Sequence, residues 1–108
     1  MPSLEARSHA SIPNGRLVDF DEAVLKESPM GGTRFLRVRG ETEHDGLNVK
    51  LAPRIYSGVP DYWVIEVIAV PSRGVTERAF ELSIPVMAVT GRCGIIVRGA
   101  SREQQFSN

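Results

Sequence analysis

Glu66 is the side chain of this chain whose surroundings best suit acid–base chemistry. It is the one charged residue in the apolar run 62–70. The side chains that would share its face of a strand are Tyr62, Val64, Ile68 and Val70. A carboxyl group held away from water can exchange protons with a substrate, but catalysis needs a second positioned group, and none is near it in the sequence. The alternative is an ion pair with a cation on a neighbouring strand, such as Arg78 or Arg37.

A second group of side chains is suited to binding phosphate. Residues 34–39 and 47–51 alternate between polar and apolar positions, and the Asp45-Gly46 turn signal between them predicts a hairpin. The hairpin would bring together one aromatic and three cationic side chains, which are Phe35, Arg37, Arg39 and Lys50. Such a face is typical of proteins that bind single-stranded nucleic acids. The 13 basic and 13 acidic residues leave no net charge to support this hypothesis, and a solvated strand face is the alternative.

Other reactive residues lack the partners that their chemistry requires. The loop 41–46 carries three carboxylates and one histidine, but its spacing does not match a calcium-binding loop. Cys93 is the only cysteine, and the chain has two histidines, so neither a zinc-ligand set nor a paired nucleophile and base is indicated. The sequence predicts no catalytic residue, no metal site and no cofactor, and an enzyme is not the expected class.

Short strands must position these side chains. The run 62–70 is rich in β-branched residues and is flanked by Pro and Gly, which favours a buried strand. We expect its deepest core residues to be Trp63, Ile65, Val67 and Ala69. Apolar segments recur at short intervals between Gly and Pro turns, which is typical of an all-β fold. We predict a small sandwich or partly open barrel of about six mostly antiparallel strands.

The sequence also predicts the local structure of two segments. Acidic residues begin the segment 21–27 and Lys26 lies near its end, which predicts one short helix capped by Asp19 or Asp21, with a strand as the alternative. The alternating segment 76–84 follows a turn signal at 71–74, so we expect it to form a second hairpin with the run 62–70.

We expect a single β domain over residues 16–99, between flexible polar tails at 1–15 and 100–108. One cysteine allows no internal disulfide, which fits the cytoplasm. The sequence has neither a signal-peptide pattern nor an apolar stretch of membrane-spanning length, so no membrane partner is expected.

The two-faced apolar strand and the missing catalytic groups predict a non-enzymatic binding module. If only one face of the run 62–70 is covered, a partner could contact Tyr62, Val64, Glu66 and Ile68. We therefore expect a protein–protein interaction module that self-associates through a sheet face or edge. Two alternatives stay open: a single-stranded nucleic-acid binder that uses the basic strand face, and a small enzyme or ligand-binding barrel with Glu66 in its pocket.

Overall fold

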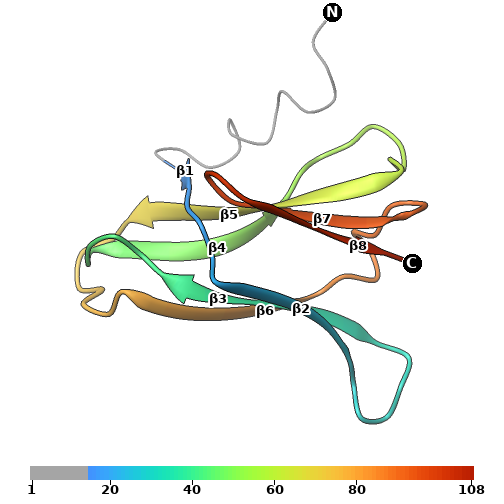
Figure 1. Ribbon diagram of the computed structural model, residues 1–108, viewed down its shortest axis with the longest axis horizontal. Coiled ribbons are helices and arrows are strands. Elements are labelled where there is room, and N and C mark those ends of the chain that lie inside the picture. The colour runs from blue at the N-terminus through green and yellow to red at the C-terminus, as the bar shows by residue number, and fades with distance from the viewer. Residues whose placement is uncertain (1–14) are drawn as a thin grey trace, which may run out of the picture.

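Strand β5 is the centre of the larger of two sheets in the computed structural model, which describes residues 15–108. The strands of this sheet are β1 (Arg16–Leu17), β4 (Leu47–Pro53), β5 (Tyr62–Pro71), β7 (Gly94–Arg98) and β8 (Glu103–Ser107). One edge of β5 pairs with antiparallel β4. Its other edge is shared, because β7 lies parallel to the first half of β5 and β1 lies antiparallel to the second half. Antiparallel β8 pairs with β7 and completes the sheet (Figure 1).

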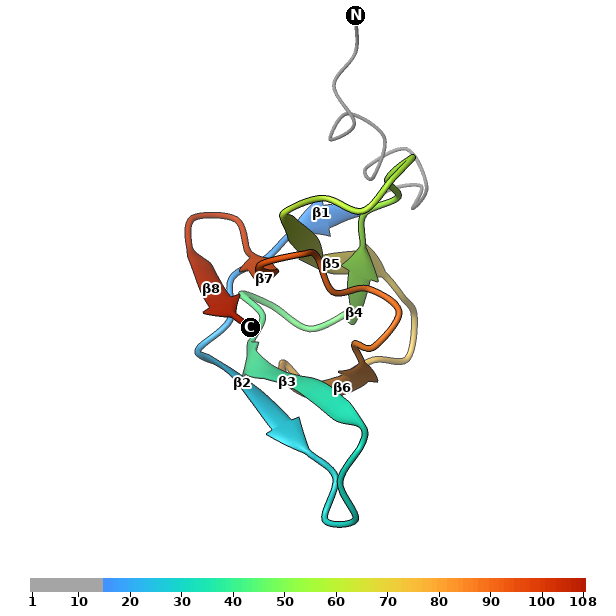
Figure 2. The same cartoon turned by 90° about the vertical axis from the view of Figure 1, so that its right-hand side faces the viewer.

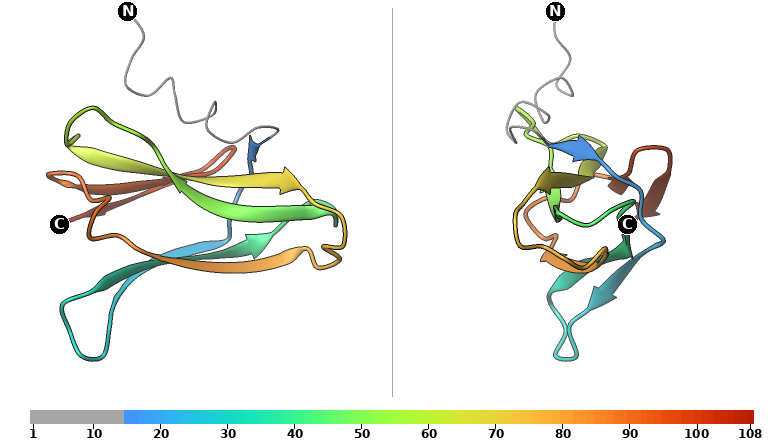
Figure 3. Two further views of the ribbon diagram at one scale, coloured as in Figure 1. Left: turned by 180° about the vertical axis from the view of Figure 1, so that it is seen from behind. Right: turned by 90° about the vertical axis from the view of Figure 1, so that its left-hand side faces the viewer.

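The smaller sheet lies across the core from the larger one. Its strands are β2 (Glu22–Glu27), β3 (Arg34–Glu41) and β6 (Ala79–Pro85), in the order β2-β3-β6 and all antiparallel. The two layers are seen edge-on in Figure 2 and from behind in Figure 3. Residues 15–108 contain no helix. The prediction of an all-β sandwich is confirmed.

The core forms where the inward faces of the two sheets meet. Ile65, Val67 and Ala69 of β5 are all 0 % exposed, as their alternation predicts, whereas Trp63 is half-buried. The opposite sheet contributes Leu36 and Val38, which are also 0 % exposed. Because burial of a Val, Leu or Ile side chain gains about 1.5–3 kcal/mol, this contact between layers is the main apolar stabilisation of the fold.

Both predicted hairpins are wrong, because each joins strands of different sheets. β3 pairs with β2 and β6, whereas β4 pairs with β5, so the loop 42–46 carries the chain from one sheet to the other. The loop 72–78 does the same between β5 and β6. Alternation of polar and apolar residues shows that a strand has one buried face, but it does not specify which strand lies beside it.

The predicted short helix over 21–27 is replaced by strand β2. Ala23 and Leu25 alternate toward the core, and β2 pairs with β3 along its whole length. A two-turn helix would be marginal without that pairing, since helices this short gain too few hydrogen bonds. The strand that the sequence left as the alternative is therefore the one that forms.

The predicted flexible tail at 100–108 is also replaced by a strand, β8. Phe106 packs against the core, and the Asn108 N–H donates to the Cys93 carbonyl at 2.8 Å. Gly94 permits the close approach of β8, because a Cβ at that position would lie 1.9 Å from the Phe106 carbonyl oxygen. The tail predicted at 1–15 lies outside the described residues, apart from its last position.

We predict that Ile65→Ala lowers the free energy of unfolding by about 2–5 kcal/mol, because it leaves a cavity between the two sheets. Lys50→Ala, an exposed change on the neighbouring strand β4, should alter it by less than about 0.5 kcal/mol. Urea unfolding followed by tryptophan fluorescence measures both values. Equal effects of the two substitutions would contradict the described core.

Candidate functional site

Glu66 lies on the outer face of β5 and forms a buried ion pair with Arg54. Arg54 follows β4 directly, and its N–H donates to the Val64 carbonyl at 2.9 Å, which aligns it beside β5. Its Nη2 and Nε atoms donate to Glu66 Oε2 at 3.1 and 3.4 Å. The side chains of Arg54 and Glu66 are 7 % and 0 % exposed. The expected ion pair is therefore present, but its cation is Arg54, whereas Arg78 pairs with Glu41 and Arg37 with Glu22.

The rest of this outer face offers no open apolar surface at the residues that the sequence singled out. Val64 and Ile68 are 4 % and 1 % exposed. Tyr62 is half-buried, and its hydroxyl accepts a hydrogen bond from Gln105 Nε2 at 3.1 Å and lies 3.2 Å from Ser107 Oγ. A partner would find little of these side chains to contact. The carboxylate of Glu66 is 0 % exposed and is held by Arg54, so a substrate cannot approach it within hydrogen-bonding distance. This argues against its use as an acid or base.

The structure separates Lys50 from the other three residues of the predicted basic surface. Phe35, Arg37 and Arg39 are on β3 of the smaller sheet, whereas Lys50 is on β4 of the larger sheet. Glu22 lies beside both arginines, with its Oε1 atom 3.7 Å from Arg37 Nη2 and 3.2 Å from Arg39 Nε. One carboxylate therefore offsets part of the positive charge of the two arginines, and with Lys50 on the other sheet the four residues do not form a continuous phosphate-binding track.

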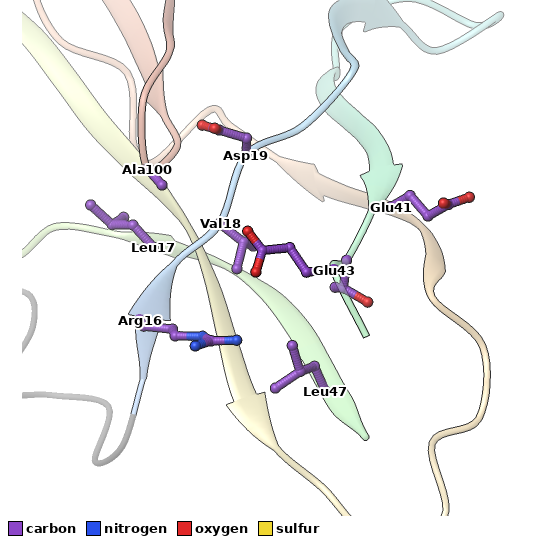
Figure 4. A pocket seen from close by; sticks show the side chains of 9 residues that line it. Arg16, Leu17, Val18, Asp19, Glu41, Glu43, Leu47 and Ala100 are labelled. Atoms are coloured by element: carbon purple, nitrogen blue, oxygen red, sulfur yellow. The ribbon is translucent and has the colours of Figure 1, made fainter. Parts of the chain in front are cut away.

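A small pocket opens at the end of the sandwich where the chain crosses from β1 to β2 (Figure 4). Its volume is about 200 Å³, and it is lined by Arg16, Leu17, Val18, Asp19, Glu41, Thr42, Glu43, Leu47 and Ala100. Pockets for drug-sized ligands usually measure about 300–1,000 Å³, so this one suits at most a very small molecule.

Asp19 in this pocket holds the turn between β7 and β8. The Ser101 hydroxyl donates to Asp19 Oδ2, and the N–H groups of Ser101 and Arg102 donate to Oδ1 at 2.7 and 3.2 Å. These bonds, the Ser101 hydroxyl first, lower the pKa of the Asp19 carboxyl below its ordinary value of 3.8. The carboxylate thus has a structural role as the acceptor that fixes residues 99–102.

The opposite end of the sandwich has a different character, and we call it the loop end. It consists of the loops 28–33, 54–61 and 86–93, which connect β2 to β3, β4 to β5 and β6 to β7 (Figure 1). The large hydrophobic side chains that are exposed within residues 15–108 all lie on these loops. They are Met30 (97 %), Ile55 (63 %), Val59 (58 %) and Met87 (61 %).

Charge is distributed unequally between the two ends. At the loop end, the stretches 28–33, 55–60 and 86–91 contain no Asp, Glu, Lys or Arg. The loops at the other end carry charged side chains, including Glu43, Asp45, Arg73, Glu77, Arg78 and Arg102. Sequence reasoning missed the loop end because these stretches are far apart in the chain. Their lack of charge is the signal that could have found it.

Two of these loops are held together by backbone hydrogen bonds. The N–H groups of Arg92 and Cys93 donate to the carbonyls of Pro60 and Asp61 at 2.9 and 2.6 Å. Arg92 and Asp61 also form an exposed ion pair at 3.0 Å. Gly91 makes the contact possible, since a Cβ there would lie 2.5 Å from the Asp61 carbonyl oxygen. These contacts fix the loops 54–61 and 86–93 relative to each other.

Within residues 15–108, no helix has the length and apolarity to cross a membrane, and no three His, Cys, Asp or Glu side chains are grouped to hold a metal ion. Comparison with protein-family models, with curated proteins and with solved structures gives no match. The site must therefore be interpreted from its own geometry.

We predict that Arg54→Met lowers the free energy of unfolding by about 3–5 kcal/mol, because it leaves a buried carboxylate without its cation. The double variant Arg54→Met/Glu66→Gln should be at least about 1 kcal/mol more stable than the single variant. Chemical denaturation measures both. Arg98→Met, which removes a more exposed ion pair with Glu103, is the control and should cost about 1 kcal/mol or less. A double variant no more stable than Arg54→Met would contradict this account.

We predict that Asp19→Asn destabilises the protein above about pH 5 by up to about 1 kcal/mol, the modest size reflecting solvent screening. The pKa of Asp19 is lowered on folding, so its stabilisation is present above the pKa of the unfolded chain and is lost as pH falls through the folded value. Unfolding measured between about pH 2 and 7 should therefore show wild type and variant converging in acid. Asp21→Asn, in the same linker, is the matched carboxylate-to-amide control.

Proposed function

We propose that this chain is a non-enzymatic protein-binding module whose binding surface is the loop end. The observation that carries the proposal is that Ile55, Val59 and Met87, all exposed, lie on the loops 54–61 and 86–93, which hydrogen bonds join at one end of the sandwich. Exposed Met30 lies at the same end on the turn 28–33, which stands apart from those loops (Figure 1). Single exposed hydrophobic residues are ordinary, but a group of them on adjacent loops is typical of an interaction surface.

The composition of the loops supports this proposal. The centres of protein–protein interfaces are depleted in Lys, Glu and Asp and enriched in Met and aromatic residues. The loop end has two exposed methionines and no charge in the stretches 28–33, 55–60 and 86–91. Loops at one end of a β-sandwich are also the binding site of antibody variable domains, which is an analogy of architecture only.

The loop end replaces the sheet face that the sequence led us to expect as the binding surface. On the outer face of β5, Val64, Glu66 and Ile68 are buried. On the outer face of β3, charged side chains such as Arg39 pair with Glu22. The exposed free thiol of Cys93 is compatible with a reducing compartment, and we propose the cytoplasm as the place where the module acts.

We predict that Ile55→Ser/Met87→Ser weakens partner binding by at least about tenfold, because both changes remove apolar contact area from the loop end. The experiment identifies proteins retained by the immobilised wild-type chain and then measures their affinity for purified variants. Because the exposed apolar side chains carry no charge, and the exposed Asp61 and Arg92 beside them pair with each other, affinity should change less than about twofold between about 0.05 and 0.5 M NaCl.

The matched control is Arg73→Ser/Glu77→Ser, which alters two exposed side chains at the opposite end. It should bind partners as tightly as the wild-type chain. Partners that bind the loop-end variant and the wild type equally well would overturn the proposal. Circular dichroism and thermal unfolding of each variant separate loss of binding from loss of fold.

A further inference from the structure

We infer that the free edge of strand β6 is a second binding site, which takes an extended peptide segment as one more antiparallel strand. The segment that fits has apolar side chains at alternate positions and Lys or Arg between them. β6 (Ala79–Pro85) comes last in the order β2-β3-β6, so only one of its edges is paired. The site uses a strand edge and not the loop end, so the inference goes beyond the proposed function.

The backbone of β6 offers a row of hydrogen-bonding groups along this free edge. The Val86 N–H donates to the Arg34 carbonyl at 3.1 Å. Such bonds join every second residue of an antiparallel pair, so the even-numbered positions of β6 face β3. The N–H and C=O groups of Ala79, Glu81 and Ser83 therefore face outward, and nothing within residues 15–108 bonds to them. An extended backbone is the complement of this row.

The opposite flank of the sandwich, between β2 and β8, is closed by side chains (Figure 2). Gln104 Nε2 donates to the Ala23 carbonyl at 3.1 Å, and Arg102 Nη1 donates to the Phe20 carbonyl at 2.8 Å. On the flank of β6, the neighbouring strand of the other sheet is β4. In the described part of the chain no side-chain hydrogen bond joins these two strands, so the β6 edge is open to an added strand.

A groove between β4 and β6 gives the apolar side chains of the segment a place to pack. Its volume is about 310 Å³, and its apolar lining includes Phe80 and Leu82 of β6 and Leu47 and Val49 of β4. Phe80 and Leu82 pack against the core but are only half-buried, whereas Leu47 and Val49 are each 6 % exposed. A strand added to β6 therefore buries more apolar surface than one added to β4, which is why we place the segment on β6.

Charge along the β6 edge favours a basic segment. Glu77 and Glu81 are exposed and line the same groove, and neither forms an ion pair with another described residue. The nearby arginines, Arg39 and Arg78, already pair with other glutamates. A Lys or Arg directly across from Glu81 stabilises the pairing, and an Asp or Glu there opposes it. The same rule disfavours two copies of β6 that pair with Glu81 facing Glu81.

Fluorescence anisotropy tests the inference with a labelled peptide of alternating valine and lysine, about as long as β6. In antiparallel pairing its lysines lie opposite Ala79, Glu81 and Ser83, so the lysine N–H groups face β6 and the valine side chains face the groove. N-methylation of the backbone at the lysines should raise Kd at least about tenfold, whereas N-methylation at the valines should change it less than about twofold. A peptide with glutamate in place of lysine should bind at least about fivefold more weakly.

Variants of the full chain then locate the site. Ser83→Pro removes an outward N–H without breaking the β3 ladder, and it should raise the Kd of the lysine peptide at least about fivefold. Glu27→Pro, the matching change on the free edge of β2, should leave that Kd unchanged. Glu81→Lys should reverse the preference between the lysine and glutamate peptides.

The inference is wrong if the lysine peptide does not bind up to about 1 mM, if the two N-methylated peptides bind alike, or if Ser83→Pro and Glu27→Pro give the same Kd. It is also wrong if the chain self-associates through this edge and excludes the peptide, which sedimentation equilibrium of wild type and Ser83→Pro detects. Ile55→Ser/Met87→Ser should bind the peptide like the wild type, so the β6 edge and the loop end are tested separately.

Discussion

The rest of the structure depends on strand β5, which is buried on both faces and paired along both edges. Its inward face supplies Ile65, Val67 and Ala69 to the contact between the sheets. Its outward face holds Glu66, which is tolerated in a buried position because Arg54 donates to it from the end of β4. The same ion pair fixes the start of the loop 54–61, so the packing of β5 also positions part of the loop end.

The sequence predicted the fold class well because the hydrophobic pattern reports burial directly. It placed β5 within one residue of its bounds and identified the face that lies deepest in the core. It could not predict which strands pair, since alternation specifies a buried face and not a neighbour. The parallel pairing of β5 with β7 is the extreme case, because the intervening chain visits the other sheet before it returns.

The candidate site was harder to predict than the fold, because every surface that the sequence suggested depended on strand pairing. Lys50 was expected beside Arg37 and Arg39, and the crossover of the loop 42–46 places it on the other sheet. The loop end depends on topology in the same way. Three uncharged stretches lie at the same end of the sandwich only because β2, β4 and β6 all run toward that end.

The separation of charge between the two ends also follows from how each end is built. At the charged end, side chains support the crossings between sheets: Asp19 holds the turn 99–102, and Arg78 donates to Glu41 and to the Glu43 carbonyl. At the loop end, backbone hydrogen bonds hold the loops 54–61 and 86–93 together, and Gly91 allows their close approach. Loops held by their backbones need fewer polar side chains for stability. Their side chains are therefore available to present an apolar surface, which is the property that a binding site requires.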